Sequence, residues 1–152
     1  PVSSCFMFFE EDNGRYVVRL EHGEKVRETL TPFLKEHRIN SGFFYGLGAL
    51  QQVELAYYTL TDKQYHSKDF NGEFELLNIT GNISFVDGGP FIHMHATLGD
   101  TEYNAFGGHV VEATVGPTFE LYIDPLWKKT IGRCLVDEIG LKLLDLKHGG
   151  KK

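Results

Sequence analysis

The chain has 152 residues, of which 41% are hydrophobic and 24% are charged. This length and composition suffice for a globular domain with a sizeable core, and they exclude collagen-like, disordered and disulfide-scaffold proteins. The 21 acidic residues outnumber the 15 Lys and Arg and give a net charge of −6. This charge disfavours tight DNA binding by the chain alone, because such binding needs a basic face.

The sequence contains no internal repeat and no low-complexity linker. We therefore expect a single domain over residues 1–148, followed by a flexible basic tail over residues 149–152. No apolar run approaches the roughly 20 residues of a membrane span, and the first residues do not follow the pattern of a signal peptide. The two cysteines, Cys5 and Cys134, are expected to be reduced thiols. These features predict a cytoplasmic protein without a membrane partner.

A hairpin and a helix are predicted at the start of the chain. Apolar residues 5–10 and the alternating residues 15–20 are separated by Asn13-Gly14, a pair that favours the positive φ angles of a type I′ turn. Apolar residues at three- and four-residue spacing then predict an amphipathic helix from Glu24 to Arg38. Pro32 lies inside this helix and could kink it, because proline removes a backbone hydrogen bond.

From residue 42 onward the pattern is mostly that of strands. We predict strands over residues 43–47, 52–60, 65–69, 74–85, 91–98, 102–106, 109–115 and 118–123. Residues 125–146 are ambiguous, because Asp124-Pro125 could begin a short helix and Leu141 to Leu146 could be either a strand or a helix. The predicted fold class is α+β, with an antiparallel-rich β-sheet and one main amphipathic helix packed on it.

Two histidines in the predicted strand 91–98 could bind a metal ion. Apolar residues occupy the even positions from 92 to 98, whereas His93 and His95 occupy odd positions. On a strand, the even residues face the core and both imidazoles share the opposite face, with their Cα atoms about 6.6 Å apart. A His-x-His pair of this kind is a natural chelate for zinc or another borderline cation.

A third histidine follows in Gly107-Gly108-His109. If Gly99-Asp100 forms a two-residue turn, perfect register places His109 on the apolar face. A one-residue bulge at the paired glycines, or an equivalent offset in the loop, would move His109 opposite Phe91 and diagonal to His93. The sequence therefore predicts a three-histidine metal site under this condition. The alternative is a hydrogen-bonded histidine in the core.

Three histidine ligands would leave one position of a tetrahedral metal ion open to water or to a small ligand, as in catalytic zinc sites. Glu102 and Glu112 are candidate bases for such chemistry, although an open position alone does not establish catalysis. The remaining histidines are expected to be solvated or to cap an element; they are His22, His37, His66 and His148.

The order and spacing of several segments resemble the plants-and-prokaryotes-conserved (PPC) domain, which in plant proteins follows AT-hook motifs. The resemblance covers nearly the whole chain. Its segments are Ile39-Asn40-Ser41-Gly42, Gly46-Leu47-Gly48-Ala49, Gly72-Glu73-Phe74-Glu75-Leu76-Leu77, His93-Met94-His95-Ala96, Gly107-Gly108-His109 and Thr118-Phe119-Glu120-Leu121.

The resemblance implies an α+β fold that assembles as a homotrimer, and zinc bound by His93, His95 and His109 as in prokaryotic members. In plant members, a Gly-Arg-Phe-Glu-Ile-Leu segment is associated with partner contacts. Here the corresponding residues 72–77 carry Glu73 in place of the arginine. We therefore expect the apolar residues of this segment, Phe74, Leu76 and Leu77, to serve strand packing.

Three functional hypotheses follow. The first is a trimeric zinc-binding PPC protein that acts as a small-molecule-binding or regulatory module. The second is a zinc-dependent enzyme, a hydrolase or lyase, that uses the open metal position. The third is a DNA-associated protein, because family members are commonly labelled DNA-binding. The Arg-Gly-Arg-Pro core of the AT-hook is absent from this sequence, and the net charge disfavours DNA as a partner.

Overall fold

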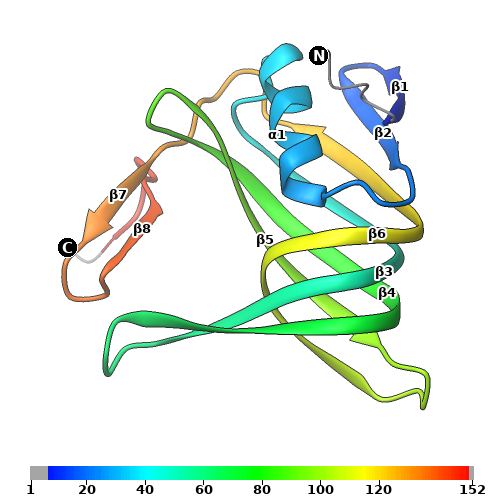
Figure 1. Ribbon diagram of the computed structural model, residues 1–152. Coiled ribbons are helices and arrows are strands. Elements are labelled where there is room, and N and C mark those ends of the chain that lie inside the picture. Colours follow the sequence, from blue (N-terminus) through cyan, green and yellow to red (C-terminus); the bar gives the residue numbers. More distant parts are fainter. Residues whose placement is uncertain (1–6, 151–152) are drawn as a thin grey trace, which may run out of the picture.

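The computed structural model describes residues 7–150, which form a curled sheet, one helix and a small separate hairpin (Figure 1). In chain order the elements are β1 (Phe8–Asp12), β2 (Arg15–Leu20), α1 (Val26–Glu36), β3 (Gly42–Thr59), β4 (Gln64–Val86), β5 (Gly89–Gly99), β6 (Ala105–Pro125), β7 (Arg133–Val136) and β8 (Leu141–Leu144).

The main sheet has six antiparallel strands in the order β1-β2-β6-β3-β4-β5. Strand β5 also pairs with β6, so β6, β3, β4 and β5 close into a ring. Figure 1 shows these long strands curling around a common interior, with α1 beside β2 and β6. The predicted α+β class, an antiparallel sheet with one helix, is confirmed.

The predicted first hairpin and helix are both present. Asn13 and Gly14 have φ angles of 50° and 77°, as a type I′ turn requires, and they connect β1 to β2. Helix α1 continues through Pro32 and ends at the C-cap His37. The carboxylate of Glu112 accepts hydrogen bonds from the backbone N–H groups of Arg27 and Glu28, and so satisfies two free donors at the helix N-terminus.

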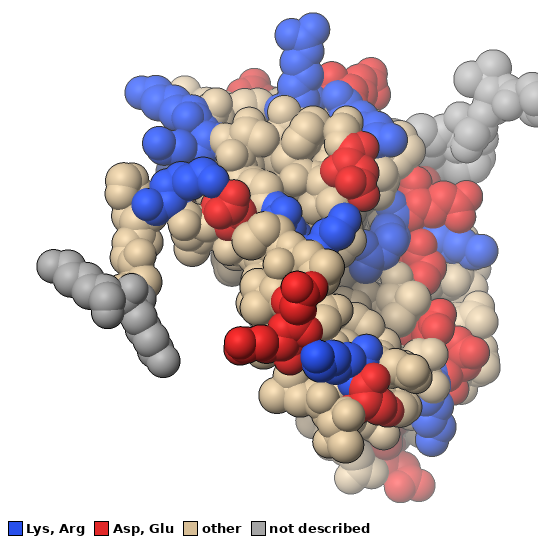
Figure 2. Space-filling model, turned by 90° about the vertical axis from the view of Figure 1, so that its left-hand side faces the viewer, with Lys and Arg blue, Asp and Glu red and all other residues tan. Residues whose placement is uncertain are grey.

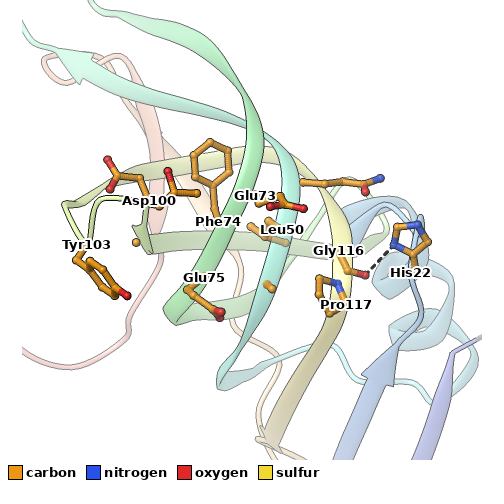
Figure 3. A pocket seen from close by; sticks show the side chains of 13 residues that line it. His22, Leu50, Glu73, Phe74, Glu75, Asp100, Tyr103, Gly116 and Pro117 are labelled. Carbon is orange, nitrogen blue, oxygen red and sulfur yellow. Dashed lines mark hydrogen bonds between the residues drawn. The ribbon is translucent and has the colours of Figure 1, made fainter.

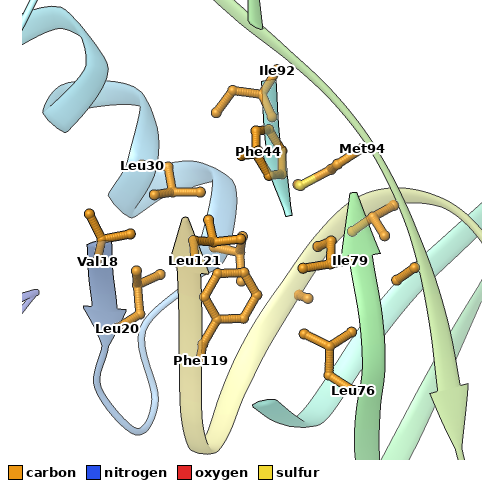
Figure 4. Close-up of a cluster of buried hydrophobic side chains, with 14 of the residues drawn as sticks. Val18, Leu20, Leu30, Phe44, Leu76, Ile79, Ile92, Met94, Phe119 and Leu121 are labelled. Atoms are coloured by element: carbon orange, nitrogen blue, oxygen red, sulfur yellow. The ribbon is translucent and has the colours of Figure 1, made fainter. Parts of the chain in front are cut away.

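The core fills the space between the ring of strands and the helix (Figure 4). Helix α1 contributes its apolar stripe, which includes Leu30, while β6 contributes Phe119 and Leu121 and β5 contributes Met94. Each of these four side chains is at most 2% exposed. Packing at this density makes truncation of a large core side chain costly, typically about 2–5 kcal/mol.

Several predicted strand boundaries are wrong because bulges carry strands through positions where a break was expected. The predicted strands 43–47 and 52–60 form one strand, β3, which ends at Thr59 and whose pairing with β4 shifts register between Gly46 and Gly48 and again between Leu50 and Gln52. Residues 109–115 and 118–123 likewise belong to one strand, β6. A bulge bends a strand without ending it, so local sequence signals at such points resemble turns.

The chain between β6 and the C-terminus resolves the ambiguity over residues 125–146. Leu141 to Leu144 form a strand that pairs with β7 in a two-stranded sheet, and no helix forms over residues 125–146. Cys134 on β7 is a free, exposed thiol. Cys5 and the last two lysines, Lys151 and Lys152, lie outside the described residues. Within residues 7–150, no helix has the length and apolar character needed to cross a membrane.

Candidate metal centre

Strand β5 presents two faces of opposite character, as predicted. Ile92 and Met94 are buried in the core, whereas His93 and His95 point to the outer face of the sheet. The neighbouring strand β4 places Asn82 opposite His93 and Thr80 opposite His95. Strand alternation thus surrounds the two imidazoles with polar neighbours on one face.

His109 joins this pair because of the loop between β5 and β6. The expected two-residue turn at Gly99-Asp100 is wrong, because residues 100–104 form the connection. Leu98 therefore pairs with Phe106, whereas a two-residue turn would pair it with Thr101, five residues earlier. An odd shift of register exchanges the two faces of a strand. His109 therefore lies directly opposite His95 on the histidine face, through a loop offset.

Gly107 and Gly108 do not form the predicted bulge; Gly107 instead lets two strands approach closely. The ladder between β5 and β6 is regular from His95 to Gly99, so the expected bulge at Gly107-Gly108 against β5 is absent and His109 does not oppose Phe91. Instead, a Cβ atom on Gly107 would lie 2.1 Å from the backbone oxygen of Ala96. Glycine is required here because the backbones of β5 and β6 approach closely.

The loop that sets this register is held by one carboxylate. Asp100 accepts hydrogen bonds from the backbone N–H groups of Glu102 and Asn104 at 2.9 Å each, and from the Asn104 side chain. These bonds lower the pKa of Asp100, with the Asn104 backbone bond as the largest cause. The predicted strand over residues 102–106 is therefore wrong at its beginning, because residues 102–104 belong to this loop.

The three imidazoles converge closely enough to share one ion. One ring nitrogen from each of His93, His95 and His109 lies within 4.8 Å of the other two. The Nε2 atoms of His93 and His95 are 3.2 Å apart. Two nitrogens that bind zinc at about 2.0 Å in tetrahedral geometry lie about 3.3 Å apart. The first pair therefore already has the spacing of two zinc ligands.

His109 supplies a second observation in favour of a metal. Its Nδ1 atom is buried and is the one buried side-chain nitrogen or oxygen of residues 7–150 without a hydrogen-bond partner. Its ring stacks on Tyr65, with ring centroids 4.7 Å apart. A buried polar atom without a partner is costly, so a nitrogen left in this state fits a ligand that the protein atoms alone do not supply.

The protonation of the cluster suits a cation. Burial, followed by the charges of His93 and His95, lowers the pKa of His109 to about 4. Burial is also the main cause that lowers the pKa of His93, followed by the charge of His95. At pH 7 both rings are therefore neutral, and neutral imidazole is the form that binds metal ions.

These shifts predict a pH dependence for the metal-free protein. The folded-state pKa of His109 lies below the unfolded value of about 6.5, so the unfolded chain binds more protons between these values. We expect the free energy of unfolding to fall as the pH drops from about 6.5 to 4, and to fall less in His109→Gln. Denaturant midpoints measured in EDTA at pH 7, 5.5 and 4.5 test this. Equal losses in both proteins would contradict the prediction.

A small cavity of about 180 Å³ opens beside the cluster. Its lining residues come from β3, β4 and β5; they are Phe43, Thr80, Gly81, Asn82, His93 and His95. The two candidate bases are elsewhere: Glu102 lies exposed in the loop over residues 100–104, and Glu112 caps helix α1. The metal cluster of the described residues contains the three histidines alone.

A larger cavity of about 660 Å³ (Figure 3) has none of the three clustered histidines in its lining. Its lining includes three carboxylates, Glu73, Glu75 and Asp100. The imidazole of His22 at its edge is bound through Nδ1 to the backbone oxygen of Gly116 at 2.9 Å, as the dashed line in Figure 3 shows. No set of three metal-ligating side chains meets within this part of the described chain.

The segment 72–77 borders this cavity. Phe74 packs against the core beside Phe106, and Leu76 is buried, so the expected packing role is confirmed for both. Leu77 is 52% exposed, contrary to expectation, because the pairing of β4 with β5 shifts register between Leu76 and Asn78. That irregularity turns the Leu77 side chain outward.

Sequence reasoning did not identify two residues beside the cluster. Tyr65 stacks on His109, and Arg133 on β7 lies close enough for its charge to lower the pKa of His93. Arg133 belongs to the segment whose structure was left open, and nothing in the spacing of these residues relates them to the histidines. Among the other histidines, His37 ends helix α1 and His66 pairs with Asp62, as a capping or solvated role predicts.

Comparison with known proteins relates the fold to a family. The sequence profile of the Plants and Prokaryotes Conserved (PCC) domain matches residues 7–127. None of the curated proteins matches the chain.

Three solved structures are similar to the chain over most of its length. One is a protein provisionally described as DNA-binding from Bacteroides thetaiotaomicron, with 28% identity and a TM-score of 0.87 over 91% of this chain and 96% of that chain. A metal-containing protein from Archaeoglobus fulgidus has 29% identity and a TM-score of 0.83 over 91% and 99%. A plant- and prokaryote-conserved (PPC) protein from Pyrococcus horikoshii has 29% identity and a TM-score of 0.81 over 94% and 97%.

Proposed function

Because the chain belongs to the Plants and Prokaryotes Conserved (PCC) domain family, we propose that it is a trimeric zinc-binding module that receives a small ligand at its metal. His93, His95 and His109 would hold the ion. The observation that carries this proposal is the convergence of three imidazoles, one of which has a buried ring nitrogen without a partner. The similar protein from Archaeoglobus fulgidus is described as metal-containing, which supports a metal in this fold.

The donor set favours zinc over calcium or magnesium. Three neutral imidazoles are borderline ligands that suit zinc, whereas calcium and magnesium prefer carboxylate and carbonyl oxygens. Three protein nitrogens would leave one tetrahedral position for water or a ligand, and a bound zinc ion would supply Lewis acidity there. The chain's own contribution is to hold the rings neutral and to shape the adjoining cavity of about 180 Å³.

Elemental analysis of the purified protein tests this proposal. We expect about one equivalent of zinc per chain after purification without chelators or metal-affinity resin. Dialysis against EDTA should remove the ion, and added zinc should restore one equivalent. A chain that neither retains zinc nor takes it up would overturn the proposal.

The outer face of the sheet supports assembly. Tyr45 on β3 and Tyr122 on β6 stack with ring centroids 5.6 Å apart, and each is about half exposed. Phe43 and Leu47 extend this apolar surface along β3, and Phe43 also lines the cavity beside the histidines. Contiguous exposed apolar surface of this kind is typical of a protein interface. A second copy of the chain would cover it and border the metal.

Assembly can be measured directly. We expect light scattering at micromolar concentration to give about three times the chain mass, as for a closed cyclic trimer. Tyr45→Glu should lower the mass to that of a monomer, because it places a charge within the apolar surface. A wild-type mass equal to one chain would show that this surface does not drive trimerisation.

The alternative of a zinc-dependent hydrolase or lyase receives less support. General acid–base chemistry needs a positioned group within hydrogen-bond reach of the reacting atoms. The two candidate carboxylates are occupied elsewhere or exposed in a loop, and the cavity beside the cluster has no carboxylate among its lining residues. Ligand binding at the metal is therefore favoured over hydrolysis.

DNA binding is also less favoured. One similar protein carries a provisional DNA-binding description. In this chain, acidic and basic side chains are interspersed on the face that Figure 2 displays, and the net charge is −6. Because affinity for DNA comes mainly from the neutralisation of phosphates by Lys and Arg, binding by such a surface should be weak at physiological salt.

A further inference from the structure

Arg133 is a cation that the structure fixes beside the histidine cluster. Its Nε donates to the hydroxyl of Ser84 at 2.8 Å, its Nη2 to the side-chain oxygen of Asn82 at 2.8 Å, and its Nη1 to the backbone oxygen of Lys142 at 3.1 Å. The guanidinium also lies over the ring of Phe91, 5.2 Å from its centroid. Arg133 lies on β7, and contacts with β4, β5 and β8 hold its side chain in place.

The same strand register that forms the cluster relates Arg133 to it. Its partner Asn82 is directly opposite His93, and its partner Ser84 is directly opposite Phe91. Asn82 and His93 both line the cavity of about 180 Å³. The guanidinium is therefore one hydrogen bond removed from the cavity that His93 and His95 line, through the side chain of Asn82.

The charge of Arg133 is not neutralised by the protein. Among residues 7–150, no carboxylate oxygen lies within 4.0 Å of its nitrogens. The three hydrogen bonds to protein oxygens use three of its five N–H groups, which leaves one on each Nη atom. A partly buried cation usually has an anionic partner, and a guanidinium with two free N–H groups suits a carboxylate.

Arg27, the other partly buried arginine near the cluster, differs in having an acidic neighbour. Its guanidinium donates to the backbone oxygens of Ile92, Val110 and Val111, and the neighbouring charge of Glu112 raises its pKa against the lowering effect of burial. Arg27 thus braces the strands under helix α1. Arg133, by contrast, bonds the side chain of Asn82, which lines the cavity, and no carboxylate is among the causes that shift its pKa.

We propose that the ligand of the metal site is a small organic acid, whose carboxylate binds Arg133 while a second oxygen occupies the open position of the metal. The inference rests on the proposed zinc site and names the class of ligand that it would take. The cavity volume of about 180 Å³ corresponds to about six waters at roughly 30 Å³ each, which matches a ligand of a few atoms. A hydroxy acid such as lactate has six non-hydrogen atoms.

The probes for this proposal are lactate and its neutral analogue lactamide. Cobalt(II) replaces zinc, because its visible spectrum reports a change at the open coordination position. We expect lactate to change the spectrum of the cobalt-loaded protein saturably, and lactamide to bind at least about ten-fold more weakly. In Arg133→Met, lactate affinity should fall by about ten-fold or more while cobalt affinity changes by less than about three-fold. Lys147→Met removes an exposed charge just after the same hairpin and should leave lactate binding unchanged.

The outcomes separate this inference from the proposed zinc site. If cobalt and zinc fail to bind, the metal site itself is refuted and the ligand assignment falls with it. If the metal binds but lactate and lactamide bind alike, or Arg133→Met binds lactate as the wild type does, the carboxylate site alone is refuted. Arg133→Lys guards against a folding defect, because it keeps the charge; it should bind lactate more tightly than Arg133→Met.

Discussion

Replacing both His93 and His95 by alanine is expected to abolish zinc binding. The two Nε2 atoms, 3.2 Å apart, would supply two of the three protein ligands, so His109 would remain alone. Loss of a hydrogen-bonding partner of a metal ligand already costs 10–100-fold in affinity, and we expect loss of two ligands to cost more than about 100-fold. Equilibrium dialysis with zinc, compared with the wild type, measures the change.

The fold should survive this double substitution. Both imidazoles lie on the outer face of β5, so alanine leaves no cavity in the core, and the melting temperature of the metal-free protein should change by only a few degrees. His66→Ala is the matched control, since His66 is a histidine on the neighbouring strand β4 that pairs with Asp62. It should retain one equivalent of zinc. Retention of full affinity by the double variant would show that the ion binds elsewhere.

Gly107→Ala is expected to destabilise the protein and to weaken zinc binding together. The added Cβ would meet the backbone oxygen of Ala96 at 2.1 Å, which forces β5 and β6 apart. We expect a loss of about 3 kcal/mol, because backbone cannot yield as a flexible side chain does, and hence a melting temperature lower by roughly 6–12 °C. His109 lies two residues away on the displaced strand, so its ring nitrogen should move away from those of His93 and His95.

Gly132→Ala provides the control for this substitution. A Cβ on Gly132 would lie 3.6 Å from the backbone oxygen of Phe85, an ordinary contact. Its melting temperature should stay within a few degrees of the wild type, with one equivalent of zinc. Thermal unfolding and dialysis on both variants distinguish the cases. If Gly107→Ala kept wild-type stability and affinity, the close approach of the two strands would not be what places His109.

The elements with strong local signals were predicted correctly from the sequence. Asn13-Gly14 determines a turn through its own φ angles, and helix α1 follows from the spacing of its apolar residues despite Pro32. The continuity of β3 and β6 could not be predicted, because a bulge is stabilised by pairing with distant strands. The β7–β8 hairpin was left undecided between strand and helix for a different reason, because its strands of four residues are too short to carry a clear pattern.

The candidate metal site was predictable in its residues and not in its geometry. Strand alternation alone placed His93 and His95 on one face. The position of His109 depends on the length of the loop over residues 100–104, which the Asp100 carboxylate fixes through hydrogen bonds that span the loop. Arg133 was out of reach, because its place beside the cluster arises from contacts between segments about 50 residues apart, as with Ser84.

X-ray absorption at the zinc edge, on the protein loaded with one equivalent, examines the coordination of the ion itself. We predict a four-coordinate first shell with three imidazole nitrogens at about 2.0 Å and one further oxygen, and a shell with one imidazole fewer in His109→Gln. A shell containing thiolate sulfur, or one that is identical in the wild type and in His109→Gln, would contradict a zinc ion held by His93, His95 and His109.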